Sequence, residues 1–236
     1  MTVPAAPTGA WRRAVVREVA HPSPAAVRLR LEVPDRIDHL PGQHYVVRLR
    51  ADDGYVAQRS YSLASPPADP LIELYVARLD DGEVSSYLAD VVEPGDELEV
   101  RGPIGGWFVW NASAPALGVA GGSGVVPLVA MLRHARVVGR TELLRLAISA
   151  RTPADLPYAD ELLAGGAVTA FSRFAVPNGR AAGRLRPDDL APLVRPDATT
   201  FVCGSSGFAE AASGLLVGLG VAPTAIRVER FGPTGV

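Results

Sequence analysis

The sequence is 236 residues long, with 48% hydrophobic and 20% charged residues and a formal net charge of -2, which is typical of a folded globular protein. This charge gives no electrostatic reason to expect nucleic acid or an anionic membrane surface as the main partner, and no apolar run reaches the roughly 18 residues that a bilayer span needs. The single cysteine, Cys203, excludes an internal disulfide and an all-cysteine iron–sulfur cluster, and the four histidines lack metal-ligand spacing, so we predict no metal site.

The first half of the chain has the pattern of antiparallel β-structure. Residues 1–7 lack the basic and apolar segments of a secretory signal, so we expect a cytoplasmic protein. From residue 27 to residue 33 apolar and charged side chains alternate, which is typical of a half-buried strand. Further strand patterns, each after a turn rich in proline and glycine, cover residues 45–49, 72–79 and 97–100. With a short helix near residues 86–91, this predicts a small antiparallel barrel.

Two motifs in this half carry candidate chemistry. In Arg59-Ser60-Tyr61-Ser62 the arginine offers a bidentate donor to phosphate, the tyrosine a face for a flat ring and the serine a hydroxyl for a ring heteroatom. From these four residues alone, a strand with an exposed arginine and a half-buried tyrosine is the alternative. The run 82–88 places a glycine turn before a helix start with serine, which is either a simple cap or an anion-binding helix N-terminus.

The second half begins with a strand, a glycine turn and a helix. An apolar run at 116–120 is followed by Gly121-Gly122-Ser123-Gly124 and then by a helical pattern from residue 125. This construction points backbone N–H groups at a phosphate, although the spacing differs from Gly-x-Gly-x-x-Gly and a tight turn without a ligand is the alternative. Strands then alternate with helices to the end of the chain, which predicts a parallel sheet covered on both faces.

Five motifs together resemble those of the ferredoxin–NADP reductase family. In chain order they are Arg-x-Tyr-Ser, Gly-x-Val-Ser-x-x-Leu, Gly-Pro-x-Gly-x-Phe with one additional residue before Phe108, Gly-Gly-Ser-Gly-x-x-Pro and Cys-Gly-x-x-x-Phe. The resemblance runs from about residue 11 to residue 231. It implies a six-stranded antiparallel FAD-binding barrel in residues 1–112, followed by a five-stranded parallel, doubly wound NAD(P)H-binding domain in residues 113–236.

The resemblance also implies roles for residues of the barrel. Arg59 would hold the flavin phosphates, Tyr61 would stack on the isoalloxazine, and Ser62 would lie near its N5 atom. The Gly-x-Val-Ser turn favours FAD over FMN, because family members with FAD hold its pyrophosphate there. The barrel residues expected to contact FAD are Arg59, Ser60, Tyr61, Ser62, Tyr75, Val76, Gly82, Val84 and Ser85.

In the second domain the resemblance implies a nicotinamide nucleotide site. The expected catalytic residues are Ser62, Cys203 and Glu229, although Cys203 could be an inert buried residue and the tail that follows Glu229 a frayed terminus. A serine–arginine pair after the third parallel strand favours NADPH, with NADH left open, and Arg180 is a further candidate for the 2′-phosphate. The residues of this domain expected to bind cofactor are Gly121, Gly122, Ser123, Gly124, Arg151, Ser172, Arg173, Cys203, Gly204 and Phe231.

The implied activity is that of a flavoprotein reductase. It would take a hydride from NAD(P)H and pass single electrons to a separate redox protein, a ferredoxin serving a monooxygenase, because too few residues remain at either end for a fused iron–sulfur domain. We expect a monomer. A free-flavin or quinone reductase on the same scaffold is one alternative. A non-catalytic flavin-binding regulatory or assembly subunit is an alternative of another class.

Overall fold

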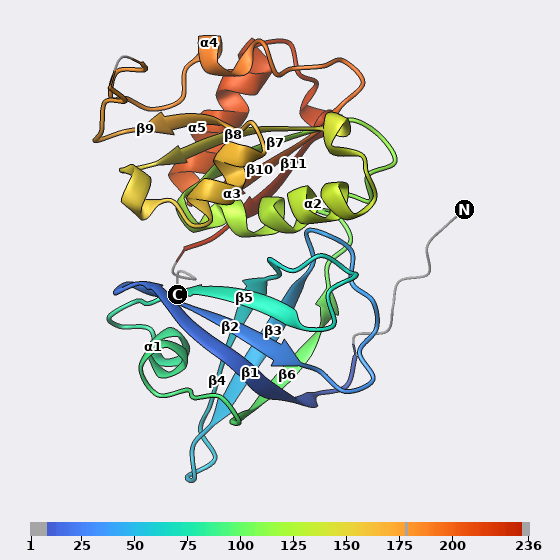
Figure 1. Ribbon diagram of the computed structural model, residues 1–236, viewed down its shortest axis with the longest axis vertical. Coiled ribbons are helices and arrows are strands. Elements are labelled where there is room, and N and C mark those ends of the chain that lie inside the picture. The colour runs from blue at the N-terminus through green and yellow to red at the C-terminus, as the bar shows by residue number, and fades with distance from the viewer. Residues whose placement is uncertain (1–8, 178, 233–236) are drawn as a thin grey trace. The chain divides into compact units, whose positions relative to one another are not determined.

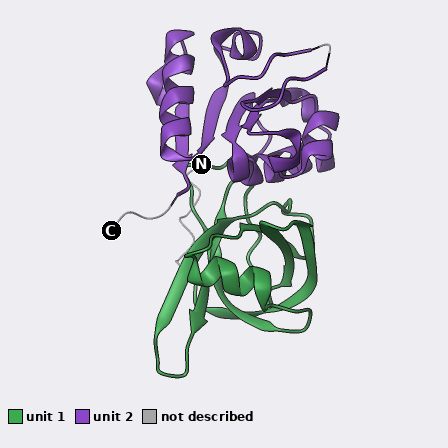
Figure 2. Cartoon of the chain, turned by 90° about the vertical axis from the view of Figure 1, so that its left-hand side faces the viewer, with its two compact units in different colours: residues 1–109 green, residues 110–236 purple. Residues whose placement is uncertain are grey.

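The computed structural model describes residues 9–177 and 179–232, and the chain divides into two compact units, 1–109 and 110–236 (Figure 2). The division falls three residues before the boundary predicted at 112/113. The second unit begins at Trp110, whose indole Nε1 donates to the carbonyl oxygen of Ala114 at 2.8 Å. Among the described residues, no helix is long and apolar enough to cross a membrane.

The first unit is a six-stranded antiparallel sheet with the order β4-β3-β6-β1-β2-β5 (Figure 1). Its elements are β1 (Arg12–Ser23), β2 (Ala26–Glu32), β3 (His44–Arg50), β4 (Val56–Ser62), β5 (Ile72–Ala77), α1 (Glu83–Asp90) and β6 (Glu97–Ile104). The two edge strands approach one another where Leu63, just after β4, bridges Leu74 of β5. The sheet therefore curls round on itself, as the sequence predicts.

The inward face of this sheet forms one apolar core with α1. Tyr45, Leu29 and Val100 are fully buried in it, and Val84 and Leu88 of α1 join the same cluster. Because residues four apart lie on one face of a helix, Val84 and Leu88 fix which side of α1 packs inward. The helix starts at Glu83, three residues before the predicted start.

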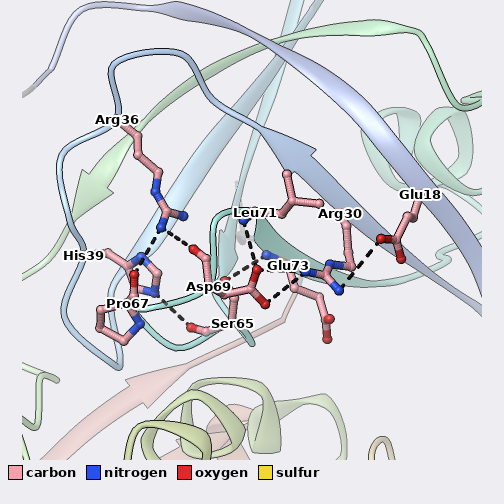
Figure 3. Close-up of polar contacts among 9 residues, drawn as sticks. All are labelled: Glu18, Arg30, Arg36, His39, Ser65, Pro67, Asp69, Leu71 and Glu73. Atoms are coloured by element: carbon pink, nitrogen blue, oxygen red, sulfur yellow. Dashed lines mark hydrogen bonds and ion pairs between the residues drawn. The ribbon is translucent and has the colours of Figure 1, made fainter. Parts of the chain in front are cut away.

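A polar network holds the segment between β4 and β5 against the rest of the barrel (Figure 3). The imidazole Nε2 of His39 pairs with the carbonyl oxygen of Ser65 at 2.9 Å, and the Ser65 hydroxyl accepts from the N–H of Glu73 at 2.9 Å. Both oxygens of the Asp69 carboxylate accept from Nη2 of Arg30, at 2.8 and 3.0 Å. Because this segment directly follows Ser62, the network fixes the end of β4.

The second unit is a five-stranded parallel sheet with the order β11-β10-β7-β8-β9, which confirms the predicted fold class. Its strands are β7 (Ala116–Gly121), β8 (Leu144–Ala150), β9 (Val168–Phe171), β10 (Thr199–Gly204) and β11 (Ile226–Arg230). Its α-helices are α2 (Val126–Val137), α3 (Ala159–Ala164), α4 (Pro187–Leu190) and α5 (Ser206–Gly218). Short 3-10 helices are η1 (Gly122–Val125), η2 (Thr141–Leu143), η3 (Pro153–Asp155) and η4 (Pro223–Ala225).

Helices cover this sheet on both faces (Figure 1). Leu117 and Val119 of β7 belong to the core cluster that includes Leu216 of α5. On the opposite face Gly118 leaves room for α2, because a Cβ atom there would lie 2.8 Å from a side-chain carbon of Leu128. Alternate residues of β7 thus pack against helices on opposite faces of the sheet, which explains why the whole strand is apolar.

Candidate functional site

In the first unit, the Arg59–Ser62 motif occupies the end of β4, which is an edge strand of the sheet. The exposed guanidinium of Arg59 donates to the carbonyl oxygen of Gln58 at 2.8 Å, and most of its N–H groups remain available. The ring of Tyr61 is half-buried against the core, and burial raises the pKa of its hydroxyl. The hydroxyl of Ser62 is buried and has no hydrogen-bond partner among the described residues.

The N-terminus of α1 lies next to β4 and carries the second predicted motif. Gly82 is the N-cap residue, and no side chain accepts a hydrogen bond from the first turn. The Ser85 hydroxyl donates to the carbonyl oxygen of Gly82 at 3.1 Å and accepts from the N–H of Leu79 at 3.2 Å. The Ser85 side chain therefore shapes the turn, and the backbone N–H groups of the turn are the ones left for an anion.

Two of the predicted barrel contacts have their side chains in the core. Val76 and Val84 are 0% and 2% exposed, so they could reach a cofactor only through their backbone atoms. Tyr75, on β5, is half-buried, and burial raises the pKa of its hydroxyl. The remaining predicted contact, Ser60, is exposed on β4.

In the second unit, the predicted nucleotide residues gather at the carboxyl edge of the parallel sheet. Gly121 ends β7 and Gly204 ends β10, and these two strands are neighbours. Arg151 follows β8, and the pair Ser172 and Arg173 follows β9. The carboxyl edge of an open parallel sheet is where such folds bind ligands, most often at the point where the strand order reverses.

The glycines at this edge have packing reasons of their own. A Cβ atom on Gly124 would lie 2.4 Å from the carbonyl oxygen of Cys203, and one on Gly121 would lie 2.7 Å from the ring of Phe208. Gly122 has a φ of +57°, and nothing lies within 4 Å of its Cβ position. The predicted turn is thus a 3-10 helix that packs tightly on β10 at Gly124 and is open at Gly122.

Two of the three arginines considered for the 2′-phosphate lie together. The N–H of Arg173 donates to the carbonyl oxygen of Arg151 at 2.8 Å, and both side chains are exposed. Arg180 is instead fixed within its own loop. Its guanidinium forms two bonds to the Asp189 carboxylate, at 2.9 and 2.7 Å, and further bonds to carbonyl oxygens of residues 181, 183 and 184. All of its N–H directions are used, so Arg180 is a brace of the loop.

Cys203 and Glu229 are paired in the register of β10 and β11. Cys203 is fully buried, and burial, followed by the charge of Glu229, raises the pKa of its thiol well above the ordinary range. Burial also raises the pKa of the Glu229 carboxyl, to about 7. Phe231 is tied to β10, because its N–H donates to the carbonyl oxygen of Gly204 at 2.9 Å. Residues 233–236 of the predicted tail lie outside the described residues.

These features fit the cofactors that the sequence predicts. A buried polar group normally has a hydrogen-bond partner, so the unpartnered Ser62 hydroxyl points to a ligand atom beside it. The uncapped start of α1 and the exposed Arg59 are suited to a phosphate, as are the uncapped η1 turn and the open Gly122 of the second unit. Among the described residues, no group of three or more potential ligands could hold a metal ion.

Comparisons with known proteins agree with this arrangement. Residues 14–109 match the oxidoreductase FAD-binding domain family. The chain is 26% identical to the ferredoxin–NAD(P)(+) reductase component of naphthalene 1,2-dioxygenase/salicylate 5-hydroxylase systems from a Ralstonia species, covering 89% of this chain and 65% of that protein. It is 28% identical to the reductase component of propane 2-monooxygenase from Rhodococcus jostii, covering 87% of this chain and 59% of that protein.

A solved structure shows the same fold. It is a ferredoxin NADP+ reductase from Neisseria gonorrhoeae with bound FAD and NADP, with a TM-score of 0.80, 20% identity, and coverage of 93% of this chain and 98% of that one. The chain spans less than two thirds of the length of the Ralstonia and Rhodococcus relatives.

Proposed function

We propose that the chain is an FAD-dependent reductase of the ferredoxin–NADP reductase type that uses NAD(P)H, because residues 14–109 match the oxidoreductase FAD-binding domain family and its relatives include ferredoxin–NAD(P)(+) reductase components. FAD would supply the redox chemistry, accepting a hydride from the nicotinamide and releasing electrons to an acceptor. The observation that carries the proposal is the hydroxyl of Ser62, which is buried and has no hydrogen-bond partner among the described residues. Ser62 ends both β4 and the Arg59–Ser62 motif.

The barrel residues would bind and orient the flavin. Arg59 and the first turn of α1 would hold the phosphates, Tyr61 would offer its ring to the isoalloxazine, and Ser62 would hold a hydrogen bond at the N5 edge. An edge strand suits this task, because a flat ring against its free side can reach side chains of both faces. These assignments rest on the positions of the side chains and on the family pattern.

The second unit would bind the nicotinamide nucleotide. The η1 turn would take its pyrophosphate, and Arg173 with Arg151 would take a 2′-phosphate, so we propose NADPH as the preferred donor. The carboxyl of Glu229, with a pKa of about 7, is suited to hold or release a proton near neutral pH. The thiol of Cys203 would act by packing and positioning, because burial keeps it protonated.

We propose a separate one-electron redox protein, such as a ferredoxin serving a monooxygenase, as the acceptor. Support comes from the reductase components of oxygenase systems among its relatives. We also propose that the reaction takes place in the cytoplasm.

Two assays test the activity. First, the flavin released on heating is expected to be FAD, and finding FMN would reject the cofactor assignment. Second, NADPH-dependent reduction of a small ferredoxin is compared with reduction of free flavins and quinones. Efficient turnover of the free flavin or quinone alone would favour the small-molecule reductase instead. Bound FAD that no nicotinamide nucleotide reduces would favour a non-catalytic subunit.

A further inference from the structure

The segment between β4 and β5, residues 63–71, follows directly on the last strand residue of the candidate flavin motif, and we call it the closing segment. Leu63 forms a bridge to Leu74 of β5, and the N–H of Ala64 donates to the carbonyl oxygen of Glu73 at 2.9 Å. Since β4 and β5 are the two edge strands of the sheet, these contacts join its edges. The position of the end of β4 therefore depends on the closing segment.

One buried histidine holds the closing segment from the loop before β3 (Figure 3). His39 is 1% exposed, and its ring Nε2 lies 2.9 Å from the carbonyl oxygen of Ser65. Because a carbonyl oxygen can only accept, Nε2 carries the proton of this hydrogen bond. The Ser65 hydroxyl accepts from the N–H of Glu73 at 2.9 Å, so Ser65 is bonded both to the histidine and to β5.

The other nitrogen of this ring has nothing to bond to. Nδ1 of His39 is buried and has no hydrogen-bond partner among the described residues. With the proton of the neutral ring on Nε2, a second proton could be added only at Nδ1. An imidazolium would then be buried with one of its two N–H groups unpaired, which is costly. The closed arrangement therefore requires a neutral ring, and burial is the main cause that lowers its pKa.

The charged groups around His39 are engaged with the closing segment or with each other. Arg36, on the same loop, donates through Nη2 to two carbonyl oxygens of the closing segment, and its charge also lowers the pKa of the imidazole. The carboxylates of Asp38 and Asp69 act in the opposite direction. Both oxygens of the Asp69 carboxylate already accept from Arg30, at 2.8 and 3.0 Å. The effect of burial exceeds that of the two carboxylates, so the neutral ring is the favoured form.

We propose that His39 is a positioning residue for the flavin strand β4, and that a proton taken up by its imidazole opens the closing segment and speeds the release of FAD. The inference rests on the proposed function and adds control by pH to its flavin site. Only a neutral ring fits the closed arrangement, so acid shifts the equilibrium towards an open one in which the charged ring is solvated. Ser62 moves with the segment, because only Leu63 and Ala64 separate it from Ser65.

The first test measures the rate of FAD release from the loaded protein after rapid dilution, by the rise of flavin fluorescence. A solvated imidazole has a pKa of about 6.5, so the open fraction and the release rate should rise about tenfold between about pH 7.5 and pH 5.5. His39→Gln keeps a donor for the Ser65 carbonyl oxygen and does not titrate, so this rise should be lost. His39→Phe, which also cannot titrate, is a second variant and should lose it too. His21→Gln, at an exposed position of β1, is the matched control and should keep the rise.

The second test follows the closing segment in the apoprotein, without flavin. Amide hydrogen exchange of Leu63, Ala64 and Glu73, corrected for the intrinsic effect of pH, should become about tenfold faster over the same range in the wild type. In His39→Gln it should not change.

The outcomes separate control by this histidine from a general effect of acid. An equal response to pH in the wild type and in the His39 variants would overturn the inference. Faster exchange in the acidified wild type with an unchanged rate of FAD release would overturn it too, because the segment would then open without moving the flavin strand. A wild type that binds no FAD would reject the proposed function, and exchange in the apoprotein would still decide whether His39 controls the segment.

Discussion

The candidate site of the barrel consists of side chains, whereas the candidate site of the second unit consists mainly of backbone N–H groups. Arg59, Tyr61 and Ser62 project from an edge strand, and their side chains make few bonds within the protein. At the carboxyl edge of the parallel sheet, Gly121 and Gly124 lack side chains because Phe208 and β10 leave no room for them. A substitution in the barrel site should therefore remove a contact to the ligand and leave the fold intact. A substitution at Gly121 or Gly124 should disturb ligand binding and the fold together.

The largest effect on the barrel side is expected from Arg59→Ala. Hydrogen bonds to a charged group contribute roughly 1.5–3 kcal/mol each, so loss of two phosphate contacts should weaken FAD binding by about 100-fold or more. Thermal unfolding of the apoprotein should not change, because the one hydrogen bond of Arg59 within the described residues is to the Gln58 carbonyl oxygen. The measurement is flavin content and FAD affinity. Arg13→Ala, a second exposed arginine of the barrel, is the control, and equal flavin retention in the two variants would reject the role of Arg59.

Gly124→Ala should show the opposite behaviour. Its new methyl group would meet the Cys203 carbonyl oxygen, which is backbone and cannot rotate away. Overpacking costs about 1–3 kcal/mol, and each kcal/mol lowers the melting temperature by roughly 2–4 °C for a chain of this size. Reduction by NADPH should fall in parallel. Gly207→Ala, in α5 with nothing within 4 Å, is the control and should be neutral or stabilising. An unchanged melting temperature in Gly124→Ala would contradict the packing account.

Arg173→Ala tests the part of the second unit where a side chain, not backbone, is expected to recognise the nucleotide. Loss of one or two charge-assisted contacts should lower the catalytic efficiency with NADPH roughly ten- to several-hundred-fold. The catalytic efficiency with NADH should change little. Arg180→Ala is the matched control, because Arg180 braces its loop through Asp189. It should reduce stability and leave the nucleotide preference intact. A wild type that uses NADH as well as NADPH would refute the assignment of Arg173.

A pH dependence of stability is expected from Glu229, which lies on β11 beside Cys203 of β10. Its pKa is about 7 in the folded protein and about 4.3 when unfolded, so its contribution is complete below about pH 4.3 and is lost as the pH rises towards 7. Glu229→Gln stays neutral and should melt at a higher temperature than the wild type at pH 8, by up to roughly 10 °C, with little difference at pH 4. Glu210→Gln, an exposed control on α5, should show no such divergence.

The sequence predicts those features that local pattern determines. Alternation in residues 27–33 and the apolar run of β7 were sufficient for two strands, and the motifs place Arg59–Ser62 and Gly121–Gly124 at the ends of strands. Features that depend on distant residues were not predictable. The sequence predicts Arg180 as a candidate for the 2′-phosphate, because nothing in the local pattern reveals its ion pair with Asp189, nine residues further along the chain.

His44 shows the same limit from the other side. It is paired with Ser62 across two strands, and neither metal-ligand spacing nor the Pro41-Gly42 turn before it reveals that register. The Pro41-Gly42 turn does mark where β3 begins. Aligning β3 with β4 as a hairpin from that start is the step that would pair His44 with Ser62.

We propose that this one chain binds FAD in its barrel and accepts electrons from a nicotinamide nucleotide bound to its second unit. An anaerobic titration of the purified, FAD-loaded protein with NADPH and then with NADH tests this most directly, with the visible flavin absorption as the readout. We expect the flavin to be bleached by about one equivalent of NADPH, and less readily by NADH. A protein that binds no flavin, or whose bound flavin stays oxidised with an excess of both nucleotides, would contradict the account.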